Sequence, residues 1–152
     1  MKILSDINPS DFEAPAANFF SLPQGLIGFP DYTQAELLYR EGQLPFLWLR
    51  LHGPKDSIYF IVIEPAGVVP GYEPELFDHD AADLEISDQS QALVLNIVSL
   101  RSQSPIDATV NLVGPIILNR RTRIARQLVV ANYSRYSAQY QLVDTNASMA
   151  CA

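Results

Sequence analysis

The chain has 152 residues, of which 48% are hydrophobic and 18% are charged, and its formal net charge is −7. A chain of this length buries a core large enough to fold without a disulfide or a metal ion. The composition excludes a disordered protein, which needs far fewer apolar residues. We expect a single domain over residues 1–143, followed by a flexible tail of small and polar residues at 144–152.

Neither a membrane segment nor a secretory signal is expected. The longest apolar run, 58–63, has six residues, whereas a spanning helix needs about 20. Asp6, Asp11 and Glu13 interrupt the region where a signal peptide needs an apolar core. The single cysteine, Cys151, provides neither a disulfide framework nor a zinc site. We therefore expect a cytoplasmic protein that does not contact membranes.

Short runs of β-branched and aromatic residues predict strands, and the 11 prolines leave little room for long helices. Single helical turns are expected at 31–35 and at 73–77, and a loop at 78–88 with a short strand at 84–86. The fold class is therefore all-β: a small antiparallel barrel or sandwich with one or two short helical turns. The expected longer strands lie at 35–40, 46–51, 57–64, 91–100, 108–113, 115–118, 124–131 and 138–143.

Three of these strands, 46–51, 58–63 and 92–98, are apolar on both faces. Such strands must be covered on two sides. In so short a chain, the cover comes from loops and single helical turns, or from a partner protein. We expect loops to supply most of it.

Charge is distributed unevenly along the chain. Through residue 95 there are four basic and fifteen acidic residues, whereas six arginines oppose two aspartates from residue 96 onward. A net acidic chain repels phosphate backbones, so nucleic acid is not an expected direct partner. A basic protein would be attracted. The alternative is that the charge only keeps the protein soluble.

Catalytic, metal and cofactor motifs are missing from the sequence. The two histidines are His52, in a turn, and His79, within an Asp-His-Asp stretch that a solvated acidic loop explains better than a metal site. A Ser-His-Asp site assembled by the fold stays open. The loop 119–123 carries three arginines, which favour salt bridges to the acidic half over contact with phosphate.

One acidic segment carries a positive signal. Residues 72–88 contain seven carboxylates and no lysine or arginine, interleaved with the apolar residues Tyr72, Leu76, Phe77, Leu84 and Ile86. Apolar anchors within a charged rim are typical of a surface that binds a basic protein. The alternative is that the apolar residues close the core of the sheet.

Three stretches in order resemble the FliW family of flagellar assembly factors. They are Gly25 to Asp31, with a Gly-apolar-x-Gly-Phe turn; Phe46 to Tyr72, with a Phe-x-Trp-Leu strand and an acidic-Pro corner; and Thr109 to Asn119, followed by Gln127. The resemblance covers about residues 18–143. The chain departs from the family pattern at Glu64, Gly71 and Gly114, and the loss of an acidic side chain at 71 weakens the case for partner contacts there.

The resemblance implies a cytoplasmic, non-enzymatic regulator, and we expect a monomer without a cofactor. Such proteins bind newly made flagellin as a chaperone, and they bind the translational repressor CsrA and keep it from silencing flagellin mRNA. A mechanism that fits the acidic charge is binding beside the RNA groove of CsrA and repelling RNA phosphates. The alternatives are a β-barrel that binds a small ligand and an enzyme of unrecognised type.

The motif residues divide by expected role. We expect turns at Gly25, Gly28, Pro65 and Pro115. We also expect core positions for Trp48, Phe60 and Leu112, and a buried polar role for Asn111. The residues that we expect at the partner interface are Phe29, Asp31, Tyr72, Glu73, Glu75, Phe77, Asp78 and Asp80.

Overall fold

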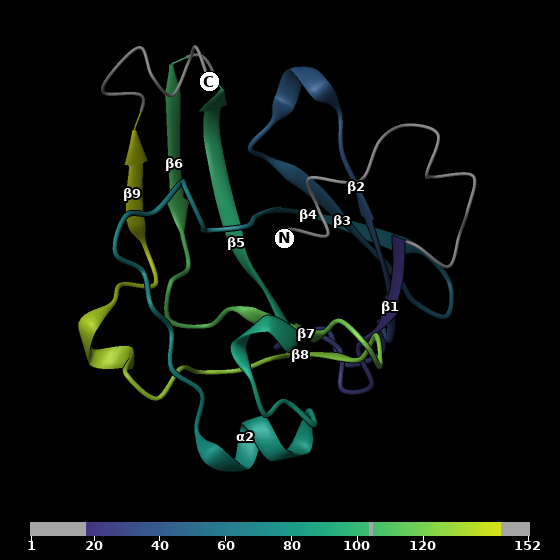
Figure 1. Ribbon diagram of the computed structural model, residues 1–152. Coiled ribbons are helices and arrows are strands. Elements are labelled where there is room, and N and C mark those ends of the chain that lie inside the picture. Colours follow the sequence, from purple (N-terminus) through teal and green to yellow (C-terminus); the bar gives the residue numbers. More distant parts are fainter. Residues whose placement is uncertain (1–17, 104, 144–152) are drawn as a thin grey trace.

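The computed structural model describes residues 18–103 and 105–143, which form one antiparallel sheet of nine strands (Figure 1). The sheet order is β1-β2-β3-β4-β5-β6-β9, and β7 pairs with β5 and β8. The strands are β1 (Phe19–Ser21), β2 (Gln34–Leu38), β3 (Leu47–His52), β4 (Ser57–Ile63), β5 (Ala92–Gln103), β6 (Ile106–Val110), β7 (Ile116–Asn119), β8 (Ala125–Gln127) and β9 (Tyr140–Val143). The predicted all-β antiparallel fold is confirmed.

Strand β5 organises the sheet because its 12 residues pair with three other strands. Its first four residues pair with β7, and five of its last six pair with β6, with a bulge at Arg101. Asn96 to Val98 pair with β4 on the other side. In Figure 1, β5 rises beside β6 and β9, while β2, β3 and β4 diverge to the right. The run at 91–100 contains no proline or glycine, so nothing in its sequence ends the strand early.

The sheet is open rather than closed into a barrel. The edge strands β1 and β8 approach each other, and one isolated parallel bridge joins Ser21 to Ile124. The Ser21 N–H donates a 2.9 Å hydrogen bond to the Arg123 carbonyl oxygen. Both strands have only three residues, which is too short for a ladder that would close the sheet. The sequence predicts an antiparallel barrel or sandwich; the antiparallel sheet is present, but it does not close into a barrel.

The apolar residues form three cores, which explains why some strands are apolar on both faces. The first core lies against one face of the sheet and includes Leu49, Leu51 and Leu95. The second lies against the other face of β4 and β5, where β6 and β9 also contribute. The third lies under the acidic segment and includes Val94 and Ile117. Loops therefore supply most of the second cover, as expected.

The short helical elements differ from the prediction in position. The α-helix α2 spans Asp78–Asp83, and 3-10 turns occur at η3 (Glu41–Gln43), η4 (Gln89–Gln91) and η5 (Tyr133–Arg135). The predicted helical turn at 73–77 and strand at 84–86 are wrong. Backbone groups of 73–75 are instead bonded to 131–132, so the helix begins only after Phe77. At 31–35, a turn ends at Asp31 and β2 begins at Gln34.

Candidate protein-binding surface

The acidic segment, residues 72–88, begins at a buried anchor. The Tyr72 hydroxyl donates a 2.7 Å hydrogen bond to the Leu112 carbonyl oxygen and accepts a 3.2 Å bond from Asn96 Nδ2. Its ring meets that of Tyr136 edge-on, with centroids 4.8 Å apart. Burial raises the pKa of Tyr72 to about 12, so the hydroxyl stays a donor at neutral pH. Tyr72 therefore attaches the segment to the Asn111–Pro115 turn.

The next residues run alongside the chain that follows β8. The Asn132 side chain accepts a 3.0 Å bond from the Glu75 N–H and donates a 2.9 Å bond to the Glu73 carbonyl oxygen. The Ala131 N–H donates a 2.6 Å bond to the Glu75 carbonyl oxygen. The backbone of this stretch is held in place while the carboxylates of Glu73 and Glu75 remain exposed.

Helix α2 carries one aspartate inward and presents others to solvent. The Asp80 residue is only 5% exposed, and its Oδ1 lies 3.4 Å from Arg126 Nη1 on β8. The same Arg126 nitrogen lies 3.4 Å from Asp83 Oδ2. Phe77 is 39% exposed and stacks on the ring of His79. Within the loop 119–123, Arg121 forms a salt bridge of the expected kind, because its Nη2 lies 3.5 Å from Glu85 Oε1.

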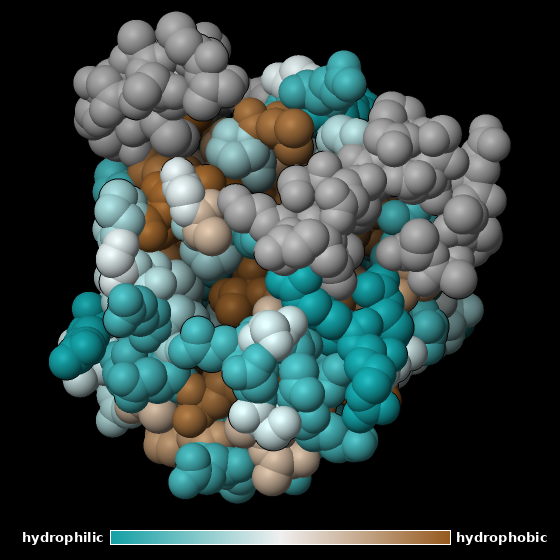
Figure 2. All heavy atoms as spheres, in the orientation of Figure 1, coloured by the Kyte–Doolittle hydropathy of each residue, from teal (hydrophilic) through white to brown (hydrophobic). Residues whose placement is uncertain are grey.

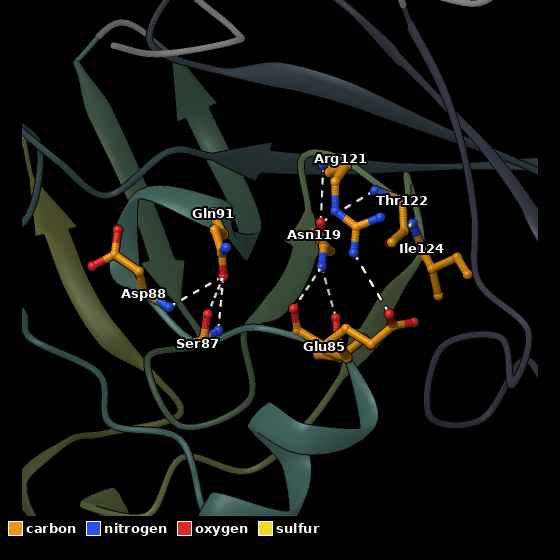
Figure 3. A network of polar contacts seen from close by, with 9 residues as sticks. Glu85, Ser87, Asp88, Gln91, Asn119, Arg121, Thr122 and Ile124 are labelled. Atoms are coloured by element: carbon orange, nitrogen blue, oxygen red, sulfur yellow. Dashed lines mark hydrogen bonds and ion pairs between the residues drawn. The ribbon is translucent and has the colours of Figure 1, made fainter.

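Asn119 fixes the far end of the segment, as Figure 3 shows. Its Nδ2 donates to the carbonyl oxygens of Leu84 and Glu85 at 2.8 and 3.3 Å. Its Oδ1 accepts from the N–H groups of Arg121 and Thr122 at 2.9 and 3.2 Å. One buried amide therefore satisfies four backbone groups and ties the acidic segment to the β7–β8 hairpin.

A groove of about 820 Å³ separates the acidic segment from the sheet. Ala92, Val94 and Ile117 line it from β5 and β7, and Leu76 and Ile86 line it from the segment. Glu73, Glu75 and Asp88 are exposed residues of its lining. Hydrogen bonds from the Ser90 side chain and backbone lower the pKa of Asp88, which keeps that carboxylate ionised. In Figure 2, brown patches lie among teal side chains in the lower part of the view, where Figure 1 draws α2. An apolar floor with an anionic rim suits a basic segment with apolar side chains.

The other candidate residues lie in a separate turn between β1 and β2. Phe29 is 37% exposed, and its ring meets Phe60 edge-on at 5.4 Å between centroids. Asp31 is exposed. The structure therefore places Tyr72, Glu73, Glu75, Phe77, Asp78 and Asp80 on one continuous segment and Phe29 with Asp31 on another. Their roles in binding stay predictions, and Tyr72 and Asp80 have their polar groups engaged internally.

The motif glycines and prolines form tight turns. Gly25 has φ +65°, and a Cβ there would lie 2.1 Å from the Phe29 carbonyl oxygen, while Gly28 has φ +92°. The Pro65 carbonyl oxygen accepts from the N–H groups of Val68 and Val69, each at 2.9 Å. The Pro115 carbonyl oxygen accepts a 3.1 Å bond from the Leu128 N–H.

Asn111 and Gln127 join the separate motifs. Asn111 Oδ1 accepts from the N–H groups of Val113 and Gly114 at 3.0 and 2.9 Å, which closes the turn before β7. Gln127 accepts a 2.9 Å bond from the Ile27 N–H and donates a 3.1 Å bond to the Gly114 carbonyl oxygen. The sequence motifs at 25–31 and 109–119 therefore meet through one side chain.

Among the residues missed by the sequence analysis, Asn96, Asn119 and Asn132 matter most. Asn96 and Asn119 are fully buried, and each bonds backbone groups from a distant part of the chain. Asparagine is uncommon in strands, so Asn96 inside an apolar run and Asn119 at the end of one were the available signal. Leu112 is 2% exposed, whereas Trp48 is partly exposed.

A serine–histidine–carboxylate arrangement, which the sequence left open, occurs on β2, β3 and β4. His52 Nδ1 lies 3.3 Å from Ser57 Oγ, and Nε2 lies 3.3 Å from Glu36 Oε1. Both distances exceed the usual range for an activated nucleophile, and Arg50 Nη1 lies 3.6 Å from the same Glu36 oxygen. We assign this set to cross-strand contacts on the sheet surface.

Two findings concern metals and membranes. Across 18–103 and 105–143, no three metal-ligating side chains gather into a potential metal site. None of the helices in these ranges is long and apolar enough to cross a membrane.

Comparison with known proteins identifies one protein family. The model of the FliW protein family matches residues 7–142. A flagellar assembly factor FliW from Natranaerobius thermophilus is 31% identical over 150 residues, which cover 99% of this chain and 97% of that protein. One from Geotalea uraniireducens is 34% identical over 125 residues, covering 82% and 74%.

A solved structure gives the same answer for the fold. The crystal structure of a flagellar assembly factor FliW superposes with a TM-score of 0.71 at 27% identity, covering 91% of this chain and 89% of that one. The likeness therefore extends through the sheet and the acidic segment, in sequence and in structure. The chain belongs to the FliW family of flagellar assembly factors.

Proposed function

We propose that this protein binds CsrA through its acidic segment in the cytoplasm, prevents CsrA from repressing flagellin mRNA, and binds newly made flagellin as a chaperone. The observation that carries the CsrA part is the groove with an apolar floor and carboxylates at its rim. Flagellin and CsrA are the partners that the family resemblance implies. CsrA binds RNA and is basic, so an anionic antagonist has matching charge.

The carboxylates of the acidic segment differ in whether they form ion pairs within the protein. Asp80 and Asp83 face Arg126, and Glu85 lies 3.5 Å from Arg121. Glu73, Glu75 and Asp78 are exposed, and within the described part of the chain no ion pair involves them. These three carboxylates therefore contribute negative electrostatic potential that no ion pair among the described residues neutralises.

The test is reversal of these charges. The triple variant Glu73→Lys, Glu75→Lys, Asp78→Lys is expected to slow association with purified CsrA by tenfold or more at low salt, and by less as salt screens the field. A matched pair of single variants, Glu75→Lys and Glu41→Lys, changes the net charge equally at two exposed sites. Only Glu75→Lys is expected to slow association. An unchanged rate in the triple variant would show that the segment is not the contact surface.

A pull-down tests the partners directly. The full chain, used as bait in extract from its own bacterium, is expected to recover flagellin and CsrA, each identified by mass spectrometry. If neither flagellin nor CsrA is recovered, the proposal fails. Adding the protein to a translation reaction with CsrA and flagellin mRNA is expected to restore flagellin synthesis.

The same groove supports a second candidate function. Its volume of about 820 Å³ lies within the range of small-molecule sites. If the protein binds a small ligand, an apolar, cationic compound is expected to raise its unfolding temperature. This rise would be the same with and without CsrA. Thermal unfolding against a library of such compounds, compared with and without CsrA, separates the two functions.

A further inference from the structure

Two arginines reach the acidic segment from the β7–β8 hairpin, and their surroundings differ. Arg126 Nη1 lies 3.4 Å from Oδ1 of the buried Asp80. Arg121 Nη2 lies 3.5 Å from Glu85 Oε1, and both side chains of this second pair are mostly exposed, at 71% and 65%. An ion pair so open to water adds little to stability, because salt screens it and two long side chains lose freedom. Stability therefore does not explain why Arg121 faces Glu85.

The fold nonetheless positions both members of the exposed pair. The buried Asn119 accepts a 2.9 Å bond from the Arg121 N–H and donates a 3.3 Å bond to the Glu85 carbonyl oxygen. Glu85 has φ +57°, in the left-handed region that costs a non-glycine residue free energy. Figure 3 shows the Arg121 side chain extending toward the Glu85 carboxylate. The pair is thus built into the fold although it contributes little to the stability of the fold.

Glu85 lies at the edge of the groove between the acidic segment and the sheet. Leu84, before it, is buried, and Ile86, after it, lines the groove. Glu73 and Glu75 belong to the same lining and form no ion pair among the described residues. The Glu85 carboxylate would extend this anionic rim, but the Arg121 guanidinium neutralises it. In the free protein, Arg121 therefore occupies the position that a cation of a basic partner would take.

We propose that Arg121 is an autoinhibitory residue, whose guanidinium holds Glu85 in the free protein and is displaced by a lysine or arginine of the basic partner. This inference rests on the proposed function, which supplies CsrA as the partner of the acidic segment. The exchange replaces one exposed ion pair with another, so only a partner with a cation at that position recovers the contact. Arg121 then lowers the affinity for CsrA and disfavours proteins that lack such a cation.

Removal of the Arg121 charge is expected to tighten binding. Arg121→Met keeps an apolar side chain but removes the cation beside Glu85. CsrA is expected to dissociate about twofold to fivefold more slowly, a factor that corresponds to one exposed ion pair. Dissociation is the sharper readout, because short-range contacts change it, whereas the field of the whole surface mainly changes association. Surface plasmon resonance with immobilised CsrA, at about 0.15 M salt, measures both rates.

Arg101 provides a matched control. Its Nη2 lies 3.2 Å from Asp107 Oδ1 in another ion pair whose side chains are both exposed. Arg101 lies near the end of β5, whereas Ala92 and Val94, at the beginning of β5, line the groove. Arg101→Met removes the same charge and breaks the same kind of pair, but CsrA is expected to dissociate at the wild-type rate. Equal slowing in both variants would show that only net charge matters, and would overturn the proposal.

A double-mutant cycle tests whether Arg121 acts through Glu85. In the Glu85→Gln background, Arg121 has no carboxylate to neutralise, so adding Arg121→Met is expected to leave dissociation unchanged. The same slowing in both backgrounds would overturn the proposal, since Arg121 would then act elsewhere. Both side chains are exposed, so the variants are expected to unfold close to the wild-type temperature. If Arg121→Met fails to fold, Arg121→Gln takes its place in the cycle.

The outcomes separate this inference from the proposed function. If the wild-type protein binds CsrA and Arg121→Met dissociates at the wild-type rate, the autoinhibitory role is wrong and the function stands. Faster dissociation of Arg121→Met would show that Arg121 itself contacts CsrA, and would also overturn the inference. If the wild-type protein does not bind CsrA, the proposed function and this inference both fail.

Discussion

The Tyr72 hydroxyl donates a 2.7 Å hydrogen bond to the carbonyl oxygen of Leu112, 40 residues further along the chain. The same hydroxyl accepts from Asn96 Nδ2, which also donates a 2.9 Å bond to the Asn111 carbonyl oxygen. This contact joins the acidic segment, the central strand β5 and the turn before β7. The Tyr72 hydroxyl is therefore one of the groups, with Asn132 and Asn119, that fix the position of the proposed CsrA surface.

Removing that hydroxyl tests the dependence. Tyr72→Phe keeps the ring against Tyr136 but leaves the Leu112 carbonyl oxygen and the Asn96 amide without a partner. Loss of a half-buried hydrogen bond of this kind costs about 1–2 kcal/mol in unfolding free energy. Urea unfolding measures it, and Tyr133→Phe, at an exposed site, is the control with no expected change. Equal stability of Tyr72→Phe and the wild type would contradict the anchor role.

Stability is expected to fall in strongly alkaline solution. Burial raises the pKa of Tyr72 to about 12, above its ordinary value of 10.0, so the unfolded chain loses this proton first. The contribution of Tyr72 is complete below pH 10 and is lost as the pH rises towards 12. The pKa of Tyr32 is also raised, by its hydrogen bond to Asp56. The difference between wild type and Tyr72→Phe, measured by urea unfolding across this window, isolates Tyr72 and should shrink with pH.

Asn119 is expected to control how firmly the far end of the acidic segment is held. Asn119→Ala leaves four backbone groups without their partner, which costs about 2–3 kcal/mol in unfolding free energy. Hydrogen exchange is expected to accelerate at 84–86 and 121–122 more than in β3. The control, Gln89→Ala, changes an exposed residue. It is expected to change the unfolding free energy by less than about 0.5 kcal/mol and to leave hydrogen exchange at 84–86 and 121–122 unchanged. Uniform acceleration across the sheet would show a global effect instead.

Two arginines of the β7–β8 hairpin, Arg121 in its loop and Arg126 on β8, should differ in their effect. Arg126 faces the buried Asp80, whereas Arg121 faces Glu85, and both members of that second pair are mostly exposed. Arg126→Met leaves the buried Asp80 carboxylate with His79 as its one ion-pair partner among the described residues, and is expected to cost about 2–3 kcal/mol in unfolding free energy. Arg121→Met is expected to cost less than about 0.5 kcal/mol. Equal effects, measured by thermal unfolding, would contradict the inward role of Asp80.

The sequence predicts the sheet well where the local pattern is strong. The hairpin of β3 and β4 and the long β5 have continuous apolar runs and clear turn residues, and their predicted positions agree with the structure to within a few residues. The family resemblance singles out three separate motifs. In the structure, hydrogen bonds of Gln127 and Asn111 connect residues of these motifs. The antiparallel character follows from short strands at regular spacing.

Long-range hydrogen bonds decided the elements that the sequence missed. Glu73 to Phe77 resembles a helical turn because Pro74 suits a first turn, but Asn132 and Ala131 engage its backbone. Strand β1 has three residues, too few for a period-two pattern to emerge. At the candidate surface, the sequence identified the acidic segment, but not that Asp80 turns inward to Arg126, because no local pattern encodes that orientation.

The turn at Gly25 offers a test of backbone geometry with an internal control. Gly25 has φ +65°, and a Cβ there would lie 2.1 Å from the Phe29 carbonyl oxygen, whereas a Cβ at Gly42 meets nothing within 4 Å. Gly25→Ala combines left-handed backbone strain with a clash against fixed backbone, so it is expected to cost about 2 kcal/mol or more. Gly42→Ala is expected to be neutral or to stabilise by up to about 1 kcal/mol, because it restricts the unfolded chain.

Because Gly25 shapes the turn whose Ile27 N–H bonds Gln127, Gly25→Ala is also expected to accelerate hydrogen exchange at Ile27. Thermal unfolding and exchange on both variants decide the matter, and a Gly25→Ala protein as stable as Gly42→Ala would refute the close approach.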